Sequence, residues 1–188
     1  MNEADEVIYI RFLEERNEED LKTLLERHRD SLVLFLYGYI HNMDDAEDLM
    51  MDTFATIVSG NVKYRVMEKS SFKTWLFSIG RNLTMNFLRK HKREFASAYA
   101  QENIESEADT PPLLILTEER NRQIYRGMEQ LNPEYREVLY LYYFEQMEHD
   151  EIGRVMKKNT KQVYNLLTRG RKSLKENLER MGFENAEF

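Results

Sequence analysis

Apolar residues in the first half of the chain recur at intervals of three and four, the spacing that places them on one face of an α-helix. The pattern predicts helices over residues 4–15, 21–39, 44–60 and 71–93. Asn17 precedes the acidic start of the second of these and can cap its first turn. The apolar face of the last is predicted to carry Phe72, Trp75, Leu76, Ile79, Leu83 and Phe87.

The helical pattern stops between residues 95 and 117, where the chain is polar and acidic and contains two consecutive prolines. Such a composition is typical of a linker. Helical spacing resumes near residue 118 and restarts at Asn132-Pro133, a capping residue followed by proline in the first turn. The sequence therefore predicts an all-α fold of two small helical domains, residues 1–94 and 118–188, joined by an acidic flexible linker, residues 95–117.

The end of the chain has a short helix over residues 149–156, a break at 157–159 and a longer helix that Thr160 can cap. Asn159 tolerates the left-handed conformation that a tight turn can need. Helix, short turn and helix form the helix-turn-helix pattern, whose second helix fits the major groove of DNA. A helical hairpin with ordinary solvated polar residues explains the same pattern.

The outward face of that longer helix carries amides that can bridge adenine N6 and N7 and cations that can contact guanine or phosphate. The residues predicted to face DNA are Lys161, Gln162, Tyr164, Asn165, Thr168, Arg169 and Lys172. Its inward face is predicted to bury Val163, Leu167, Gly170 and Leu174.

Charge changes this picture because it is unevenly distributed. The formal net charge is −7. Residues 63–93 nevertheless hold nine Lys or Arg and one Glu, and residues 151–180 hold nine Lys or Arg and three Glu. Residues 94–119 hold seven acidic residues and no Lys or Arg. Two basic blocks flanking an acidic one are the electrostatic signature of phosphate binding, although solvated helix faces also explain charge runs.

A second polar face lies on the helix over residues 71–93. Asn82, Asn86, Arg89 and Arg93 are spaced to share it, and Lys63-Tyr64-Arg65 mixes cations with an aromatic ring ahead of it. Cations and aromatic rings suit the holding of a single strand by charge and stacking. A solvated face explains the same spacing.

Composition excludes several classes of protein. The absence of Cys excludes disulfide scaffolds, cysteine zinc sites and thiol catalysis, and 7 Gly with 3 Pro disfavour an all-β fold. The four His are scattered and no phosphate-binding glycine loop occurs, so we expect no enzyme, metal or cofactor. No apolar run is long enough to span a membrane and the N-terminus is acidic, so we expect a cytoplasmic protein without membrane insertion.

Five motifs resemble those of the extracytoplasmic-function sigma factors, the small group 4 sigma subunits of bacterial RNA polymerase. Residues 45–54, Asp-Ala-Glu-Asp-Leu-Met-Met-Asp-Thr-Phe, resemble D-A-E-D-L-x-Q-E-x-F, and residues 72–82 resemble F-x-x-W-L-x-x-I-A-x-N. Residues 131–138 resemble L-P-x-x-x-R-x-V with one inserted residue. Residues 151–153 and 169–174 resemble E-I-A and R-A-R-x-x-L.

The resemblance implies an alternative sigma factor that binds core RNA polymerase and directs promoter-specific initiation without catalysis of its own. Residues 1–94 would be sigma region 2, and residues 118–188 would be the region 4 helix-turn-helix, which reads the −35 element with the seven residues named above. The residues implied in core polymerase binding are Asp44, Asp45, Glu47, Asp48, Leu49, Asp52 and Phe54. Those implied in −10 recognition and melting are Lys63, Tyr64, Arg65, Lys73, Arg81, Asn82, Asn86, Arg89, Lys90 and Arg93.

The same resemblance implies promoter DNA and an anti-sigma factor as further partners, nucleoid association within the holoenzyme, and an acidic linker that threads toward the polymerase cleft. Three departures from the family pattern bear on specificity. Met51-Asp52 stand in place of Gln-Glu, Asn86 in place of an Asp, and residues 161–166 differ from the usual recognition helix. Two other functions remain open: a stand-alone helix-turn-helix regulator, and a polymerase-binding interaction protein without DNA recognition.

Overall fold

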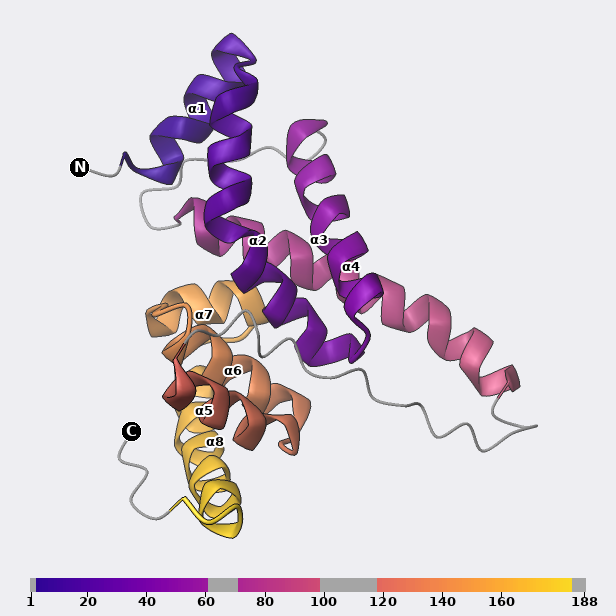
Figure 1. The fold of residues 1–188 in the computed structure, drawn as a ribbon, viewed down its shortest axis with the longest axis vertical. Coiled ribbons are helices and arrows are strands. Elements are labelled where there is room, and N and C mark those ends of the chain that lie inside the picture. Colours follow the sequence, from indigo (N-terminus) through magenta and orange to yellow (C-terminus); the bar gives the residue numbers. More distant parts are fainter. Residues whose placement is uncertain (1–2, 61–70, 99–117, 184–188) are drawn as a thin grey trace. The chain divides into compact units, whose positions relative to one another are not determined.

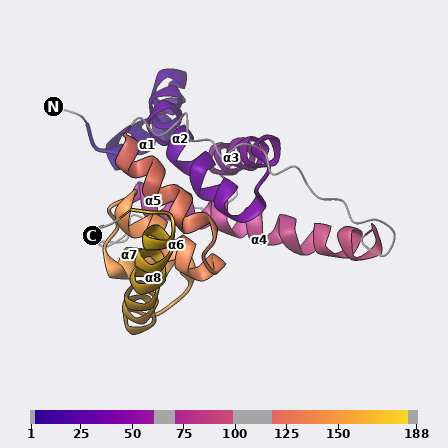
Figure 2. The same ribbon diagram turned by 60° about the horizontal axis from the view of Figure 1, so that its bottom comes forward.

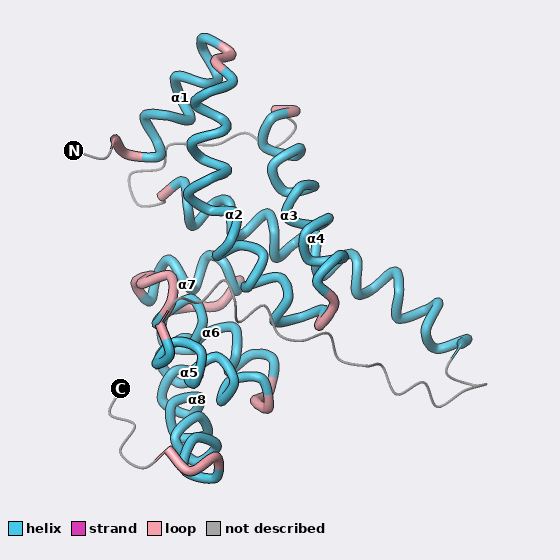
Figure 3. Tube along the Cα trace, viewed as in Figure 1, coloured by secondary structure: helices cyan, strands magenta, loops and turns pink. Residues whose placement is uncertain are grey.

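The computed structural model describes residues 3–60, 71–98 and 118–183, and side chains over these ranges except 92–98. In this part of the chain the regular structure consists of eight α-helices, and no strand occurs (Figures 1 and 3). The helices divide between two compact units, Met1–Asp109 and Thr110–Phe188. The predicted all-α fold class is confirmed.

The first unit is a four-helix arrangement of α1 (Asp5–Glu15), α2 (Glu18–Ile40), α3 (Met43–Val58) and α4 (Phe72–Ala98). Helix α2 packs against all three of the others, and α4 also contacts α3 and α1 (Figure 2). Helix α4 extends past Arg93 into the segment predicted as linker. Ala96 and Ala98 are strong helix formers, and no proline follows before Pro111, so nothing local stops the helix at Arg93.

Asparagine side chains set the starts of α2 and α3. The Asn17 amide oxygen accepts the Glu19 N–H at 3.0 Å, as predicted, and that of Asn42 accepts the Asp45 N–H at 2.9 Å. Each bond satisfies one of the four N–H groups that a helix start leaves without an intrahelical partner. The Asn42 cap starts α3 at Met43, one residue earlier than the sequence pattern predicts.

The buried face of α4 is rotated relative to the one that the sequence predicts. Trp75, Leu83 and Phe87 are only half-buried, whereas Phe77 and Thr84 are buried. The cause is the close approach of α2 and α3 to α4 at Gly80, where an added Cβ would lie 3.1 Å from a Leu32 methyl. The prediction that Trp75 is a core residue was therefore wrong: its ring lies at the core edge, 5.3 Å from that of Tyr9.

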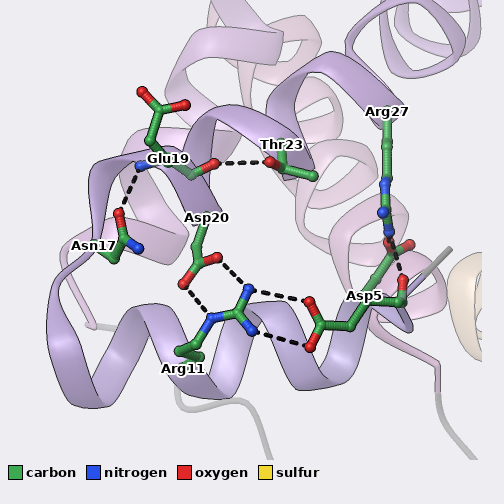
Figure 4. A network of polar contacts seen from close by, with 8 residues as sticks. Asp5, Arg11, Asn17, Glu19, Asp20, Thr23 and Arg27 are labelled. Atoms are coloured by element: carbon green, nitrogen blue, oxygen red, sulfur yellow. Dashed lines mark hydrogen bonds and ion pairs between the residues drawn. The ribbon is translucent and has the colours of Figure 1, made fainter.

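Ion pairs join α1 to α2 (Figure 4). The Arg11 guanidinium donates to Asp20 of α2 through both Nε, at 2.8 Å, and Nη2, at 2.5 Å. Asp5 accepts from Arg27 at 2.6 Å and lies 2.7 Å from Nε2 of His28. The hydrogen bond with His28, followed by that with Arg27, lowers the pKa of Asp5 despite partial burial.

The second unit contains α5 (Glu119–Glu129), α6 (Pro133–Tyr143), α7 (His149–Met156) and α8 (Thr160–Arg180). Helix α8 packs against the three others. The four residues predicted to face inward from α8 are all buried, and Gly170 lies against the Leu139 side chain of α6. Asn132 caps α6 and Pro133 is its first residue, as the sequence predicts.

The turn between α7 and α8 differs from the prediction in two residues. Lys157, not Asn159, adopts the left-handed conformation, with φ 56°. Asn159, not Thr160, is the N-cap of α8: its side chain accepts the Gln162 N–H at 2.9 Å while the Gln162 side chain accepts the Asn159 N–H at 2.9 Å. Gln162 at the third helical position completes this reciprocal capping box, which Thr160 as N-cap could not form with it.

Gly153 makes the tight turn possible. The Lys158 N–H donates to the Gly153 carbonyl at 2.8 Å, and a Cβ at Gly153 would lie 2.6 Å from the Lys158 carbonyl oxygen. Because this oxygen belongs to the backbone, a side chain at position 153 would displace the turn itself.

We expect Gly153→Val to lower the free energy of unfolding of the second unit by about 1–3 kcal/mol, the usual cost of overpacking. Circular dichroism during urea unfolding measures it. Lys175→Val, at an exposed position of α8, controls for the lower helix propensity of valine. Equal stabilities of the two variants would contradict the prediction.

Asp5→Asn should lower the free energy of unfolding by about 1 kcal/mol at neutral pH, a value reduced by solvent screening. Because the folded-state pKa of Asp5 lies below its ordinary value of 3.8, its stabilisation is complete above that value and lost as pH falls further. The difference between variant and wild type should therefore shrink below about pH 4.

Trp75 is the chain's single tryptophan and lies in the first unit, so its fluorescence during urea unfolding follows this unit. Asp30→Asn, which removes an exposed carboxylate from α2, is the matched control. A stability difference for Asp5→Asn that stays constant down to pH 3 would contradict the assignment.

Candidate nucleic-acid interface

The solvent-facing side of α8 contains every residue predicted to face DNA. Lys161, Gln162, Tyr164, Asn165, Thr168, Arg169 and Lys172 are all exposed. Tyr164 is 62% exposed, an unusual value for a large aromatic side chain. The helix therefore presents amides, cations and one aromatic ring together on one side, with its apolar side held by the core.

Two of these side chains already have local hydrogen bonds. The Gln162 amide oxygen accepts the Asn159 N–H, and the Thr168 hydroxyl donates to the Tyr164 carbonyl at 2.9 Å. Bidentate reading of adenine by Gln162 needs that same oxygen as an acceptor and the amide N–H as donor. Base contact by Gln162 must therefore share or replace the bond that caps α8.

A cluster of rings and one cation packs beside α8. The Arg171 guanidinium lies 4.6 Å from the Tyr142 ring centre, and its Nε donates to the Tyr143 hydroxyl at 3.0 Å. Burial raises the pKa of Tyr143 above its ordinary value. The His149 ring stands between those of Tyr142 and Tyr164, at 5.9 and 6.4 Å.

Sequence spacing could not reveal this cluster, because its members come from α6, α7 and α8. It also divides the cations of α8 into two kinds. Arg169 and Lys172 are exposed, whereas Arg171 is half-buried and held by tyrosines. Arg171 therefore stabilises the helix-turn-helix.

The predicted polar face of α4 is only partly exposed. Asn86, Arg89 and Lys90 are exposed, whereas Lys73, Arg81 and Asn82 are half-buried. Arg89 donates to the Asn86 side-chain oxygen at 2.5 Å, one turn apart on the helix. Lys63, Tyr64, Arg65 and the Arg93 side chain lie outside the described residues.

Helix α3 presents an acidic face. Asp44, Asp48 and Asp52 are exposed at intervals of four residues, beside Met51, which is 54% exposed. Asp45 and Glu47 are half-buried. Leu49 and Phe54, also predicted to contact polymerase, are 6% and 5% exposed and lie in the core. These two side chains pack in the core, and the exposed surface of α3 consists largely of its carboxylates and Met51.

Among the described residues, no group of three or more His, Asp or Glu is placed to hold a metal ion. None of the described helices combines the length and apolar character that crossing a membrane requires.

Two family models match the chain. The model of sigma-70 region 2 matches residues 24–94, and that of sigma-70 region 4 matches residues 121–174. The first spans most of the four-helix unit and the second most of the helix-turn-helix unit. The chain belongs to the extracytoplasmic-function sigma factor family.

Curated relatives agree with this membership. RNA polymerase sigma factor YlaC of Bacillus subtilis is 23% identical over 165 residues, which cover 87% of this chain and 94% of that protein. The ECF RNA polymerase sigma factor SigM of the same organism is 25% identical over 159 residues, covering 81% and 91%.

Solved structures share the fold. The sigma factor RpoE from Bartonella quintana, in complex with the anti-sigma factor NepR, matches with a TM-score of 0.70 and 24% identity over 86% of this chain and 98% of that one. CnrH, in complex with the cytosolic domain of CnrY, matches with a TM-score of 0.67 and 20% identity over 95% and 99%. Both likenesses bear on the fold alone.

Gln162→Glu should separate stability from DNA binding in this sigma factor. A glutamate at the third helical position retains the capping box and suits the helix dipole, so the free energy of unfolding should stay within about 0.5 kcal/mol of wild type. The change removes the amide donor and adds a negative charge, so affinity for a −35 duplex should fall about tenfold or more. Fluorescence anisotropy and urea unfolding measure the two effects.

Gln162→Ala is the comparison, because it removes both the cap and the amide and should lower stability as well as affinity. Unchanged DNA affinity in Gln162→Glu would show that this face of α8 does not contact the duplex at Gln162.

Proposed function

We propose that this sigma factor directs promoter-specific initiation through two helical units that bind different targets. The first unit binds core RNA polymerase and recognises the −10 element, and the second reads the −35 element. The solvent face of α8 carries the proposal, because seven exposed side chains able to contact bases or phosphates share one side of a helix sized for the major groove.

The acidic face of α3 is suited to a basic surface on polymerase. Its three exposed carboxylates and Met51 form a patch that combines charge with an apolar contact. Charge complementarity of this kind raises the association rate and sets orientation. A negative patch on a DNA-binding chain also keeps that side away from phosphate.

The polar face of α4 is suited to the −10 element. Asn86 and Asn82 supply hydrogen-bonding edges for bases, and Arg89, Lys90 and Arg81 supply positive charge. Melting requires capture of an unstacked base at a cost of a few kcal/mol. Tyr64 with Lys63 and Arg65, just ahead of α4 in the sequence, would contribute stacking and charge.

The remaining proposals concern partners and place of action. The acidic segment 95–117 is suited to a basic channel in polymerase, where its carboxylates would mimic nucleic acid. An anti-sigma factor is a further proposed partner, supported by the shared fold with RpoE, which was solved in complex with the anti-sigma factor NepR. The chain acts in the cytoplasm, on the nucleoid within the holoenzyme, and catalyses no reaction itself.

We expect core polymerase with this protein to produce discrete transcripts from a genomic fragment library that core polymerase alone does not. Their start sites define the −10 and −35 elements. A triple variant, Lys161→Ala, Asn165→Ala and Arg169→Ala, should lose these transcripts while retaining core binding, since the three residues lie on α8 and far in sequence from α3.

Two outcomes would contradict the proposal. No promoter-dependent transcripts, with specific duplex binding by the protein alone, would indicate a stand-alone regulator. Unaltered activity of the triple variant would indicate a polymerase-binding protein without DNA recognition by α8.

A further inference from the structure

Helix α1 begins and ends before the segments matched by the family models, yet it bonds to all three other helices of its unit. The matches start at residue 24, whereas α1 spans Asp5–Glu15. Asp5 pairs with Arg27 of α2. Toward α3 and α4 the contacts are of another kind, because they are made to backbone groups at helix ends.

The contact with α3 comes from a buried tyrosine. The Tyr9 side chain is 1% exposed, and its hydroxyl donates to the Ile57 carbonyl at 3.1 Å. Ile57 lies one residue from the end of α3, where carbonyl groups have no intrahelical partner. The bond therefore satisfies a buried donor and a helix-end acceptor together.

The contact with α4 comes from a carboxylate. Glu6 Oε1 accepts the N–H of Phe72, the first residue of α4, at 2.7 Å. A carboxylate at a helix N-terminus is stabilised both by the free N–H and by the helix dipole. Just before α4, the Ser71 hydroxyl accepts the Thr74 N–H at 3.2 Å, and Glu6 adds a second cap from a distance of 66 residues in sequence.

Aromatic packing adds to the contact between α1 and the start of α4. The Tyr9 ring lies 5.1 Å from that of Phe72 and 5.3 Å from that of Trp75. Tyr9 therefore touches the first turn of α4 with its ring and the last turn of α3 with its hydroxyl. A single residue of α1 thus sets the spacing between the two helix ends.

We propose that α1 positions the −10-reading helix relative to the polymerase-binding helix, with Glu6 and Tyr9 as the positioning residues. The proposal rests on the proposed function of α3 and α4. Asn82 lies ten residues after Phe72, so the rise of an α-helix places it about 15 Å along α4 from the Glu6–Phe72 contact. At that distance a tilt of roughly 4° displaces it by about 1 Å, more than a recognition site tolerates.

The test compares transcription from a promoter with an intact −10 element and from the same promoter with a substituted −10 element. Their ratio does not depend on how much of the protein is active. We expect Glu6→Ala and Tyr9→Phe to reduce the ratio about fivefold or more with affinity for core polymerase unchanged. Glu6→Gln retains an oxygen acceptor for the Phe72 N–H and should keep a ratio near that of wild type.

Glu14→Ala is the matched control, because it removes an exposed carboxylate from the same helix. If Glu6 and Tyr9 only stabilise the unit, transcription from both promoters will fall in proportion and the ratio will not change. That result would overturn the positioning role of α1 and leave the proposed function intact. If wild-type protein yields no promoter-dependent transcription, the proposed function fails and the proposal fails with it. Should Glu6→Ala not fold, Tyr9→Phe, which removes one hydroxyl, decides the outcome.

Discussion

Backbone groups at helix ends are the constraint on which this structure depends. Every helix leaves N–H groups at its start and carbonyl groups at its end without partners, and the eight helices in the described part of the chain create many such ends. Asn17, Asn42, Asn132 and Asn159 cap four helix starts. Glu6 and Tyr9 satisfy two further ends from a different helix. Helix ends in this protein are therefore capped both by neighbouring residues and by residues of another helix.

Some side chains take part both in stabilising a helix and in the proposed recognition of DNA. Gln162 contributes to the cap of α8 and stands on the face proposed to contact DNA. Asn86 accepts from Arg89 on the face proposed for the −10 element. Binding of DNA must therefore compete with, or extend, bonds that already order these side chains. Ordering them in advance reduces the entropy lost on binding.

Charge is separated by element, and this separation explains how a chain of net charge −7 can serve as a DNA-binding factor. The exposed carboxylates of α3 lie on one helix, and the exposed cations of α4 and α8 lie on others. The net charge weakens attraction to arbitrary DNA, whose affinity depends mainly on phosphate contacts. In the proposed function, specific binding then depends on contacts of α8 with bases and on the polymerase together.

The sequence by itself determined the helices, the helix-turn-helix, and the inward face and exposed residues of α8, because these depend on spacing within one element. Tertiary structure decided what depends on contacts between elements. The approach of α2 and α3 at Gly80 rotated the buried face of α4 and left Trp75 at the core edge. The packing of α3 buried Leu49 and Phe54, which the motif alone placed at the polymerase surface. The Arg171–Tyr143 bond and the bonds of Tyr9 to Ile57 and of Glu6 to Phe72 join residues 28 to 66 positions apart, a distance at which no local pattern carries information.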